Sequence, residues 1–567
     1  MTSDAIYYII YAMKITGAAA IVKCLLEQDA TTVFGYPGGQ IIDLFDALYQ
    51  EPQINQILTS HEQGAAHAAE GFARATGKTG VVIATSGPGA TNLVTGIADA
   101  YLDSIPLVAI TGNVPVALLG RDSFQEVDIA GITMPITKHN FIVKDPDELC
   151  DAIRRAFYIA RSDRPGPVLV DVPKNVQQAL VEYVQKPVAP PHKPPMQADV
   201  TDAVSLIDRS ERPVIYAGGG CIASGASAEL LAFAEHIQAP IASSMMGLTA
   251  VPTDSPYCAG LIGMHGRASV ARLVGKADLI IAVGARFSDR VAGDRAKFCK
   301  HAKIVHIDID AAEIDKNVTT DAHIRGDVAQ VLKLLTHAVA KKTDDGMIRL
   351  NAELKAAAPL PPCRGGLSPR TVIKYVSDNV GDAVIATDVG QHQMWVAQGY
   401  GFRAPRTFLT SGGLGTMGFG LGAAIGGAVG TGKRAVLFTG DGSFHMNMNE
   451  LATATRLGIK LTVLVFDNRT LGMVRQWQTL FYDKRYSSTD LDGNKTDFVK
   501  LAEAFGAKGY RLERDADVAS VIGAALAQDG VTVVDCVIDK DELVLPMIPP
   551  GKTMNDIITE ITAEDEK

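Results

Sequence analysis

Cysteine is scarce and scattered in this chain. The 567 residues include seven cysteines, an odd number, and none of them stands in C-x-x-C spacing. Structural zinc sites usually draw on cysteines paired at such short spacing, and oxidising compartments favour an even number of paired cysteines. The cysteine pattern therefore argues against a structural zinc site and favours a reducing cytoplasm.

Positive charge is also in deficit. Lys and Arg total 53 against 63 Asp and Glu, which gives a net charge of −10. Binding to nucleic acid or to an anionic membrane surface depends on clustered Lys and Arg. The composition therefore predicts neither nucleic acid nor a membrane as a partner, and small anionic substrates would need locally placed positive charge.

One stretch imitates a membrane span, because residues 407–432 carry no charge and show small-xxx-small spacing. Its many glycines and its polar start favour a buried helix packed tightly against a sheet. Residues 6–13 are apolar, but no basic stretch precedes them and no cleavage site follows, so a secretory signal is not expected. Residues 1–12 are interpreted as an N-terminal extension.

The remaining composition is that of a soluble globular protein, with 47% hydrophobic and 20% charged residues, and the length predicts two to four domains. Two proline-rich segments, 186–195 and 358–366, are typical of linkers. They divide the chain into three predicted domains, which are residues 13–185, 196–357 and 367–567.

Each predicted domain contains short apolar strands that run into glycine-rich loops and alanine-rich helices. The clearest examples are GVVIATSGPGATN, PVIYAGGG, LIIAVGARFSDR, KIVHIDIDA and AVIATDVGQH. This alternation is typical of doubly wound α/β domains with parallel sheets. We therefore predict an α/β fold of three such domains.

The most informative segment runs from Gly440 to Asn468. It predicts a strand ending in Gly440-Asp441-Gly442, a single helix over 443–458, a second strand, and then Asp467-Asn468. A carboxylate and an amide at neighbouring strand ends supply oxygen ligands that suit a magnesium ion carrying phosphate oxygens. A plain tight turn at Gly-Asp-Gly is the alternative.

The sequence GDGSFHMNMNELATATRLGIKLTVLVFDN, followed by TLGMVRQWQ, resembles the large catalytic subunit of acetohydroxyacid synthase, also called acetolactate synthase. The similarity extends from Met13 over nearly the whole chain. The resemblance implies three cofactors: thiamine diphosphate, Mg²⁺ and FAD. It also implies that FAD is structural and takes no part in redox chemistry.

Glu62 lies in the segment ILTSHEQGAAHAAEGFARATG, where Ser60 and Gln63 predict a capping box at the start of a helix. From position alone, an exposed glutamate in a first helical turn is the alternative. The resemblance implies that Glu62 hydrogen-bonds the aminopyrimidine ring of the cofactor and promotes its imino tautomer.

The resemblance further implies a catalytic set on the same domain and a diphosphate set on the third. The catalytic set adds Gly39, Phe124, Gln125 and Lys174, for which plain turns and a surface lysine are the alternatives. The diphosphate set comprises Gly390, Gln391, His392, Met417, Gly440, Asp441, Gly442, Ser443 and Asn468. The metal ligands would be Asp441, Asn468 and the backbone of Thr470. For His392 and Met417, a structural histidine and a core methionine are the alternatives.

The middle domain carries GMHGRASV and GARFSDRVAG, which resemble the FAD-binding segments of acetohydroxyacid synthase; catabolic acetolactate synthases lack the second motif. The positions implied to contact FAD are Arg164, Gly218, Gly219, His265, Gly284, Arg286, Asp308 and Asp327. The resemblance places Arg290, Met473 and Trp477 around the acceptor substrate. A surface salt bridge is the alternative for Arg290, and core packing is the alternative for Trp477.

The implied reaction decarboxylates pyruvate and joins the two-carbon unit to a second 2-oxo acid, pyruvate or 2-oxobutyrate, in branched-chain amino acid biosynthesis. A homodimer or homotetramer is expected, because the family completes its site across a subunit interface. A regulatory small subunit is expected as well. Pyruvate oxidase and sulfoacetaldehyde acetyltransferase of the same superfamily are the alternatives.

A nucleotide-hydrolysing enzyme is a more distant alternative, based on a near match to a phosphate loop at 427–433. Arg434 argues against it, because it stands where a hydroxyl should hold magnesium. The glycines also precede a strand, whereas a phosphate loop follows one.

Overall fold

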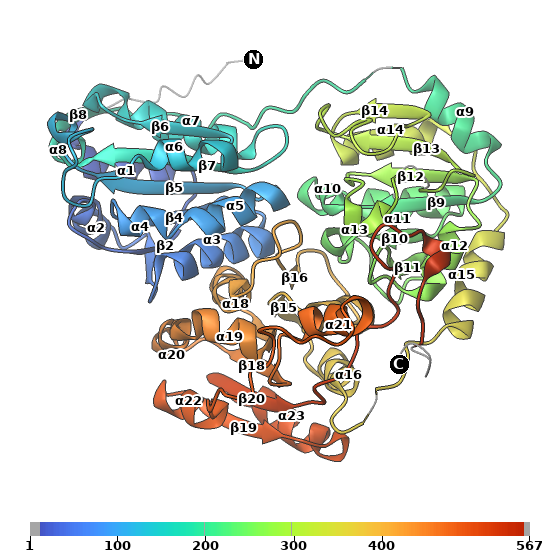
Figure 1. The fold of residues 1–567 in the computed structure, drawn as a ribbon. Helices are drawn as coiled ribbons and strands as arrows, with labels where there is room; N and C mark the ends of the chain where they lie inside the picture. Colours follow the sequence, from blue (N-terminus) through green and yellow to red (C-terminus); the bar gives the residue numbers. More distant parts are fainter. Residues whose placement is uncertain (1–11, 198, 296–297, 364, 561–567) are drawn as a thin grey trace. The chain divides into compact units, whose positions relative to one another are not determined.

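The fold was analysed in a computed structural model that describes residues 12–197, 199–295, 298–363 and 365–560. The predicted extension therefore falls almost entirely outside the described residues. These residues form three six-stranded sheets and one two-stranded antiparallel ribbon of β1 (Met13–Thr16) and β8 (Leu180–Tyr183) (Figure 1). The chain divides into two compact units between His192 and Lys193, inside the predicted linker, with Ala75–Gly77 grouped with the second unit.

The sheet of the first domain has the spatial order β3-β2-β4-β5-β7-β6, and all of its strands are parallel. Its strands are β2 (Thr32–Tyr36), β3 (Asn55–Leu58), β4 (Gly80–Ala84), β5 (Leu107–Asn113), β6 (His139–Ile142) and β7 (Pro167–Pro173). The central strands β4, β5 and β7 are buried throughout, as expected for a parallel sheet covered on both faces. The uninterrupted apolar runs in the sequence are the consequence of this burial.

Helices of the first domain pack on this sheet through a common apolar core. The helices that carry site residues or core residues are α1 (Gly17–Glu27), α2 (Ile42–Tyr49), α3 (Glu62–Thr76), α4 (Pro88–Thr91), α5 (Val94–Asp103), α6 (Ile129–Thr133), α7 (Leu149–Arg161) and α8 (Lys174–Gln178). Residues from α1, α2 and α7 form one core cluster with alternate residues of β4, β5 and β7. The period-two alternation of a strand explains why only every second strand residue joins that cluster.

The middle domain has a parallel sheet in the order β11-β10-β9-β12-β13-β14. Its elements are α9 (Thr201–Arg209), β9 (Pro213–Ala217), α10 (Gly219–Ala223), α11 (Ser227–Ile237), β10 (Ile241–Ser243), β11 (Cys258–Leu261), α12 (Ala268–Val274), β12 (Leu279–Val283), α13 (Asp289–Ala292), β13 (Lys303–Asp308), β14 (Ala322–Arg325), α14 (Val328–Ala338) and α15 (Gly346–Ala357). In chain order the strands read 3-2-1-4-5-6, the order typical of dinucleotide-binding domains. Separate core clusters cover the two faces of this sheet.

The third domain has the parallel order β16-β15-β17-β18-β20-β19. Its elements are α16 (Pro369–Asn379), β15 (Ala383–Thr387), α17 (Gln391–Gly399), β16 (Phe408–Leu409), α18 (Phe419–Thr431), β17 (Arg434–Gly440), α19 (Asp441–Asn447), α20 (Leu451–Leu457), β18 (Leu461–Asp467), α21 (Gly472–Phe481), α22 (Phe498–Ala504), β19 (Lys508–Leu512), α23 (Val518–Leu526) and β20 (Val531–Val537). In chain order this is 2-1-3-4-6-5, the same order as in the first domain. The sequence similarity in style between the two domains therefore reflects a shared topology.

Each sheet has a central point at which the strand order reverses, and several predicted site residues, such as Gly39, Gly218 and Asp441, follow the strands at that point. The reversal falls between β2 and β4, between β9 and β12, and between β15 and β17. Ligands of open α/β sheets bind in the crevice at the carboxyl ends of such strands. By this rule, ligands are expected at these loops in each domain.

The prediction of a single helix over 443–458 is wrong, because the helix is interrupted. The segment forms α19, a 3-10 turn at Met448–Glu450 and α20. Asn447 leaves helical backbone at φ −137°, and its side-chain amide donates to the Gly418 carbonyl at 2.8 Å. An asparagine that bonds to backbone elsewhere competes with the helical pattern, which explains the interruption.

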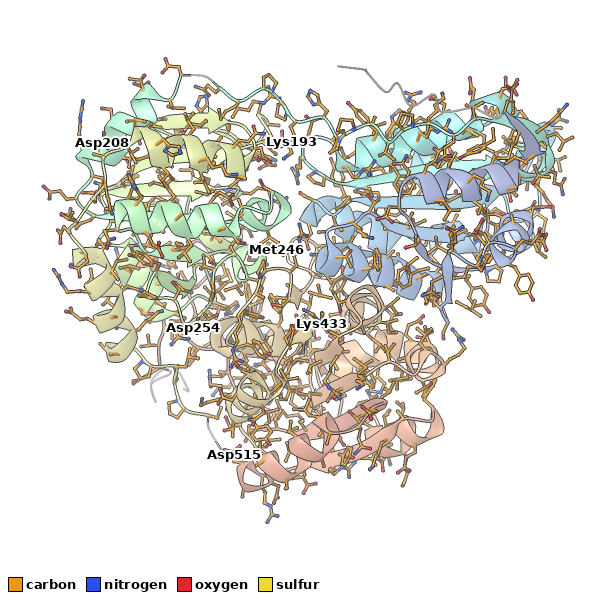
Figure 2. The ribbon with its side chains drawn as sticks, turned by 180° about the vertical axis from the view of Figure 1, so that it is seen from behind. Lys193, Asp208, Met246, Asp254, Lys433 and Asp515 are labelled. Atoms are coloured by element: carbon orange, nitrogen blue, oxygen red, sulfur yellow. The ribbon has the colours of Figure 1, made fainter. Side chains whose placement is uncertain are left out.

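The uncharged stretch 407–432 forms β16 and the buried helix α18, as expected. Within the described residues, no helix is long and apolar enough to cross a membrane. Gly427 lies inside α18, where an added Cβ would stand 2.7 Å from Leu409 Cδ1. Lys433, labelled in Figure 2, forms an ion pair with Asp382 at 2.8 Å. Gly427 thus serves close packing on the sheet, and residues 427–431 belong to a helix and not to a loop after a strand, so the phosphate-loop alternative is excluded.

We expect Trp395→Ala to destabilise the third domain strongly. The Trp395 side chain is 1% exposed, contacts Phe466 edge-on and donates its indole N–H to the Leu543 carbonyl at 3.2 Å. Loss of a buried tryptophan costs about 3–5 kcal/mol of the free energy of unfolding. Denaturant titration followed by the fluorescence of the remaining tryptophan, Trp477, measures the loss. Tyr49→Ala, at a side chain that is 85% exposed, is the control and should change the midpoint little.

Candidate active site

Asp441 and Asn468 lie at the ends of adjacent parallel strands. In the register of β17 and β18, Gly440 faces Phe466, so Asp441 and Asp467 continue the two strands side by side. Asp441, Asp467 and Asn468 are all buried. The Asn468 side chain is oriented through Nδ2, which donates to Gln391 Oε1 at 3.3 Å. Its Oδ1 accepts from the Thr470 backbone N–H at 3.2 Å.

The electrostatics of this edge favour a cation. Burial raises the pKa of the Asp441 carboxyl to about 7, and the neighbouring Asp467 carboxylate adds to the rise. Hydrogen bonds from the backbone N–H groups of Gly442 and Arg469 act in the opposite direction and do not offset it. Two buried carboxylates beside each other are therefore held at an energetic cost that a bound cation would relieve.

Gln391 and His392 approach the same edge from the first turn of α17. Gln391 Nε2 donates to the Glu542 carbonyl at 2.7 Å, which fixes its Oε1 toward Asn468. Burial lowers the pKa of His392 to about 3, so its imidazole is neutral. Its Nε2 is buried and has no hydrogen-bond partner among the described residues. An added Cβ at Gly440 would stand 3.2 Å from His392 Nδ1, so glycine permits this approach.

The loop around Gly442 brings Met417 and Ser443 to the same place. An added Cβ at Gly442 would meet Leu471 Cδ2 at 2.8 Å and Met417 Cε at 3.7 Å. Ser443 Oγ donates to the Val389 carbonyl at 3.1 Å, which joins α19 to the loop after β15. Because Gly390, in that loop, has φ +156°, only glycine adopts its backbone readily. The structure thus brings the whole predicted diphosphate set to one sheet edge.

Asp388 is a functional candidate that the sequence analysis missed. It is 1% exposed, and its carboxylate accepts from the Thr439 hydroxyl at 2.6 Å and from the Gly420 N–H at 2.8 Å. It therefore ties together β15, β17 and α18, which carry the site loops. An acidic residue directly after an apolar strand, in ATDVG, was the available signal.

In the first domain, Glu62 is the first residue of α3 and is half-buried. Asn92 Nδ2 donates to Glu62 Oε2 at 2.9 Å, and an added Cβ at Gly89 would lie 3.3 Å from Glu62 Oε1. The loop TSGPGATN therefore surrounds this carboxylate. The helix begins one residue later than the predicted capping box implies, and His61 Nδ1 accepts from the Gln63 N–H at 3.1 Å.

The structure also pairs two other members of the predicted catalytic set. Lys174, at the start of α8, donates its Nζ to the Gly39 carbonyl at 2.8 Å. Gln125 has a left-handed backbone with φ +59°, and an added Cβ at Gly87 would meet its carbonyl oxygen at 2.9 Å. Phe124 is 83% exposed, an unusual position for a phenylalanine. No contact between Phe124 and the others is established within the described residues.

In the middle domain, Gly218 and Gly284 meet at the reversal point between β9 and β12. An added Cβ at Gly218 would stand 2.1 Å from the Gly284 carbonyl oxygen, and Gly284 has φ +54°. Gly219 is less confined, because its added Cβ would meet Met246 Cβ at 3.1 Å. Met246 is labelled in Figure 2. Close backbone approach at such a point leaves space for a dinucleotide.

Other predicted FAD positions lie after strands of the same sheet or on its loops. Burial and the charge of Arg290 lower the pKa of His265 to about 4, and its buried Nδ1 has no partner among the described residues. Asp308 ends β13 and accepts from the Asp310 N–H at 2.9 Å. The backbone carbonyl of Arg286 accepts from the Tyr216 hydroxyl at 3.2 Å.

Two of the predicted FAD residues are already engaged in structural contacts. Asp327 caps α14 and accepts from Lys193 Nζ at 2.8 Å and from Ser224 Oγ at 3.0 Å. Arg164 lies in the first domain, where its Nε donates to Ser104 Oγ at 2.8 Å. A structural role explains both residues without a ligand, so their role toward FAD stays a prediction.

The predicted acceptor residues occupy exposed or half-buried positions. Arg290 is exposed, and its Nη1 donates to Met264 Sδ at 3.3 Å. Met473 and Trp477 lie one turn apart on α21 and so share a helix face. Trp477 packs against the cluster of Leu543, Leu545 and Met547, which agrees with the packing alternative for part of its surface.

Comparison with known proteins identifies the class. Residues 15–132, 200–335 and 388–536 match the N-terminal TPP binding domain, the central domain and the C-terminal TPP binding domain of thiamine pyrophosphate enzymes, in that order. The chain therefore belongs to the enzymes that use thiamine diphosphate.

Full-length relatives narrow the assignment. The chain is 46% identical to a probable acetolactate synthase large subunit of Methanocaldococcus jannaschii, over 97% of this chain and 96% of the relative. It is 45% identical to the acetolactate synthase large subunit of Corynebacterium glutamicum, over 96% and 90%. It is 42% identical to the acetolactate synthase of Arthrospira platensis, over 96% and 98%. Within its class, the chain belongs to the acetolactate synthase family.

We expect Gly218→Ala to disrupt the crevice of the middle domain, because the new methyl group would clash with the backbone of Gly284 and not with a movable side chain. Overpacking of this kind costs about 3 kcal/mol. Thermal unfolding and the flavin absorbance of the purified protein measure the effect. Gly219→Ala is the matched control, and equal behaviour of the two variants would contradict this account of the crevice.

Proposed function

We propose that this chain decarboxylates pyruvate and joins the resulting two-carbon unit to a second pyruvate or to 2-oxobutyrate. The observation that carries the proposal is full-length similarity to acetolactate synthases, and the gathering of the predicted diphosphate set at one sheet edge supports it. Thiamine diphosphate, when bound, supplies the carbon nucleophile and the electron sink of this chemistry. Incubation of the purified chain with pyruvate, Mg²⁺ and thiamine diphosphate, with and without FAD, followed by product identification, tests it.

We propose that Asp441, Asn468 and the backbone of Thr470 hold Mg²⁺. The residues fit such an ion, because carboxylate and carbonyl oxygens are its preferred ligands and the raised pKa of Asp441 reports a site that lacks positive charge. The free Nε2 of His392 and the glycines at 440 and 442 would receive the diphosphate beside it.

Glu62 would hold a proton at the aminopyrimidine ring of the cofactor. Asn92 fixes one oxygen of its carboxylate, so the second oxygen, Oε1, is the atom that would face the ring. A positioned carboxyl group of this kind acts as a general acid and base. Gly39, Lys174, Gln125 and Phe124 would line the substrate side, and Gly39 and Lys174 are joined directly.

Arg290 would bind the carboxylate of the acceptor substrate, because its guanidinium is exposed and presents a planar fork of donors. Met473 and Trp477 would shape the apolar side of that pocket. FAD would occupy the crevice between β9 and β12, which the dinucleotide-binding strand order and the orphan Nδ1 of His265 support.

Partners and organisation belong to the same proposal. Relatives are named large subunits, which supports a regulatory small subunit for this chain. We also keep the homodimer or homotetramer, the cytoplasmic location and the domain boundaries 13–185, 196–357 and 367–567 as parts of the proposal. Each six-stranded sheet lies inside one of these three ranges, which supports the boundaries.

We expect Glu62→Gln to lower the rate of acetolactate formation by at least about a hundredfold, because general acid–base groups contribute rate factors of this order. Steady-state product assays measure the rate, and flavin absorbance shows whether FAD stays bound, as it should. Glu148→Gln, at an exposed glutamate of the same domain, is the control. Unchanged activity in Glu62→Gln would remove the role assigned to Glu62.

We expect the affinity for Mg²⁺ to rise with pH through neutrality. The ion needs the ionised Asp441 carboxylate, and a pKa of about 7 means that protons compete with the metal below that value. The ionised fraction, and with it the affinity, should increase about tenfold between pH 6 and pH 8. Calorimetric titration with Mg²⁺ in the presence of thiamine diphosphate measures this.

Asp171→Asn is the control for that titration, because it removes a different buried carboxyl whose burial raises its pKa to about 6. The dependence on pH should persist in Asp171→Asn and disappear together with binding in Asp441→Asn. Equal affinity of the unaltered protein for Mg²⁺ at pH 6 and pH 8 would show that ionisation of Asp441 does not control binding of the ion.

A further inference from the structure

The loop that follows β2 has its tip at Gly39. Its neighbours Gly38 and Gln40 contact other parts of the domain, whereas Gly39 faces open space. An added Cβ at Gly38 would stand 2.5–2.8 Å from three atoms of the Thr85 side chain. At Gly39, in contrast, an added Cβ would have no heavy atom of the described residues within 4 Å. The loop therefore presents the backbone of Gly39, which is exposed, toward open space.

Three side chains hold the backbone at this tip. The Gln40 N–H donates to Thr85 Oγ1 at 3.3 Å, and the Gly39 carbonyl accepts from Lys174 Nζ at 2.8 Å. The Gln40 carbonyl accepts from Gln177 Nε2 at 2.8 Å. At Gly112, an added Cβ would stand 2.3 Å from the Gln40 carbonyl oxygen, so β5 leaves space for that carbonyl.

Gln177 is the buried member of this arrangement. Its side chain is fully buried on α8, and Nε2 also donates to the Val172 carbonyl at the end of β7, at 2.9 Å. Its Oε1 has no hydrogen-bond partner among the described residues. A buried acceptor without a partner is destabilising, and an apolar side chain of equal size would avoid that cost. Packing alone therefore does not explain a glutamine here, whereas its two amide donors do.

We propose that Gln177 is a positioning residue that fixes the Gly39–Gln40 backbone to the end of β7 and so sets where Gly39 meets the substrate. This inference rests on the proposed function, which places Gly39 and Lys174 beside the reacting groups. Lys174 is exposed in part and bonds the loop through a flexible side chain, whereas Gln177 bonds it from inside the core. Loss of the buried bond would leave the Gln40 carbonyl unpaired and free the tip to move.

The test is Gln177→Met, which keeps the length and volume of the side chain and removes both amide donors. Gln178→Met is the matched control, because Gln178 is the next residue on α8, is exposed and bonds the Asp43 side chain and not the Gly39–Gln40 backbone. Should Gln177→Met fail to fold, Gln177→Leu replaces it, because that smaller apolar side chain also removes both amide donors and leaves no unpaired charge in the core.

Two measurements are made on the full-length protein. Hydrogen exchange of the segment 37–41 should accelerate about tenfold in Gln177→Met and stay unchanged in Gln178→Met. In the enzyme loaded with its cofactors, kcat/KM for pyruvate should fall about tenfold or more, as expected when a reacting group is displaced by roughly an ångström. The affinity for thiamine diphosphate should stay within about twofold, because the loop would not contact the diphosphate.

A third measurement separates positioning from general damage. When pyruvate and 2-oxobutyrate compete as acceptors, a displaced loop tip should change the ratio of the two products, whereas a partly unfolded preparation should keep that ratio. Unchanged exchange, an unchanged kcat/KM, or a loss of activity that only parallels loss of thiamine diphosphate would each overturn the proposal.

Failure of the proposed function has a different signature. If the unaltered chain makes no acetolactate, the proposed function falls. The hydrogen-exchange comparison of the two variants then still decides whether Gln177 holds the loop.

Discussion

The site depends on one geometric constraint, which is the point in each parallel sheet at which the strand order reverses. At that point the helices connected to the two neighbouring strands pass to opposite faces of the sheet, and their loops leave a crevice between them. This chain repeats the arrangement three times, between β2 and β4, between β9 and β12, and between β15 and β17. Several residues assigned to cofactor or substrate, including Gly39, Gly218 and Asp441, follow these strands, and others such as Glu62 and Asn468 follow the next strand of the same sheet.

Buried polar groups then fix the loops and side chains at these points through hydrogen bonds. Asp388 ties two strands and a helix together through Thr439 and the Gly420 N–H, and Asn92 fixes one oxygen of Glu62. Such networks are costly when one member is missing and rigid when all are present. In the third domain no described side-chain cation offsets the raised pKa of Asp441 beside Asp467, so the proposed Mg²⁺ would supply the missing positive charge.

Sequence reasoning predicted the strands, the glycine-rich loops and the edge that carries Asp441 and Asn468, because apolar runs and turn residues are local signals. It failed at Asn447, where a contact with Gly418 interrupts a helix that local propensity favours. It also missed Asp388 and Gln177, since their partners lie far along the chain. Hydrogen bonds between residues far apart in the chain leave no periodic pattern in the sequence. Only the folded structure shows which buried amide or carboxylate holds two elements together.

The contact between Gly218 and Gly284 has a genetic consequence. Every change in the first or second base of a glycine codon adds a side chain or stops translation, and at Gly218 the first carbon of that side chain would stand 2.1 Å from a carbonyl oxygen. Codon drift at this position is therefore confined to the silent third base. At the neighbouring Gly219, an added Cβ would meet Met246 Cβ at 3.1 Å, a much milder contact, so two adjacent glycines of one loop are expected to evolve at different rates.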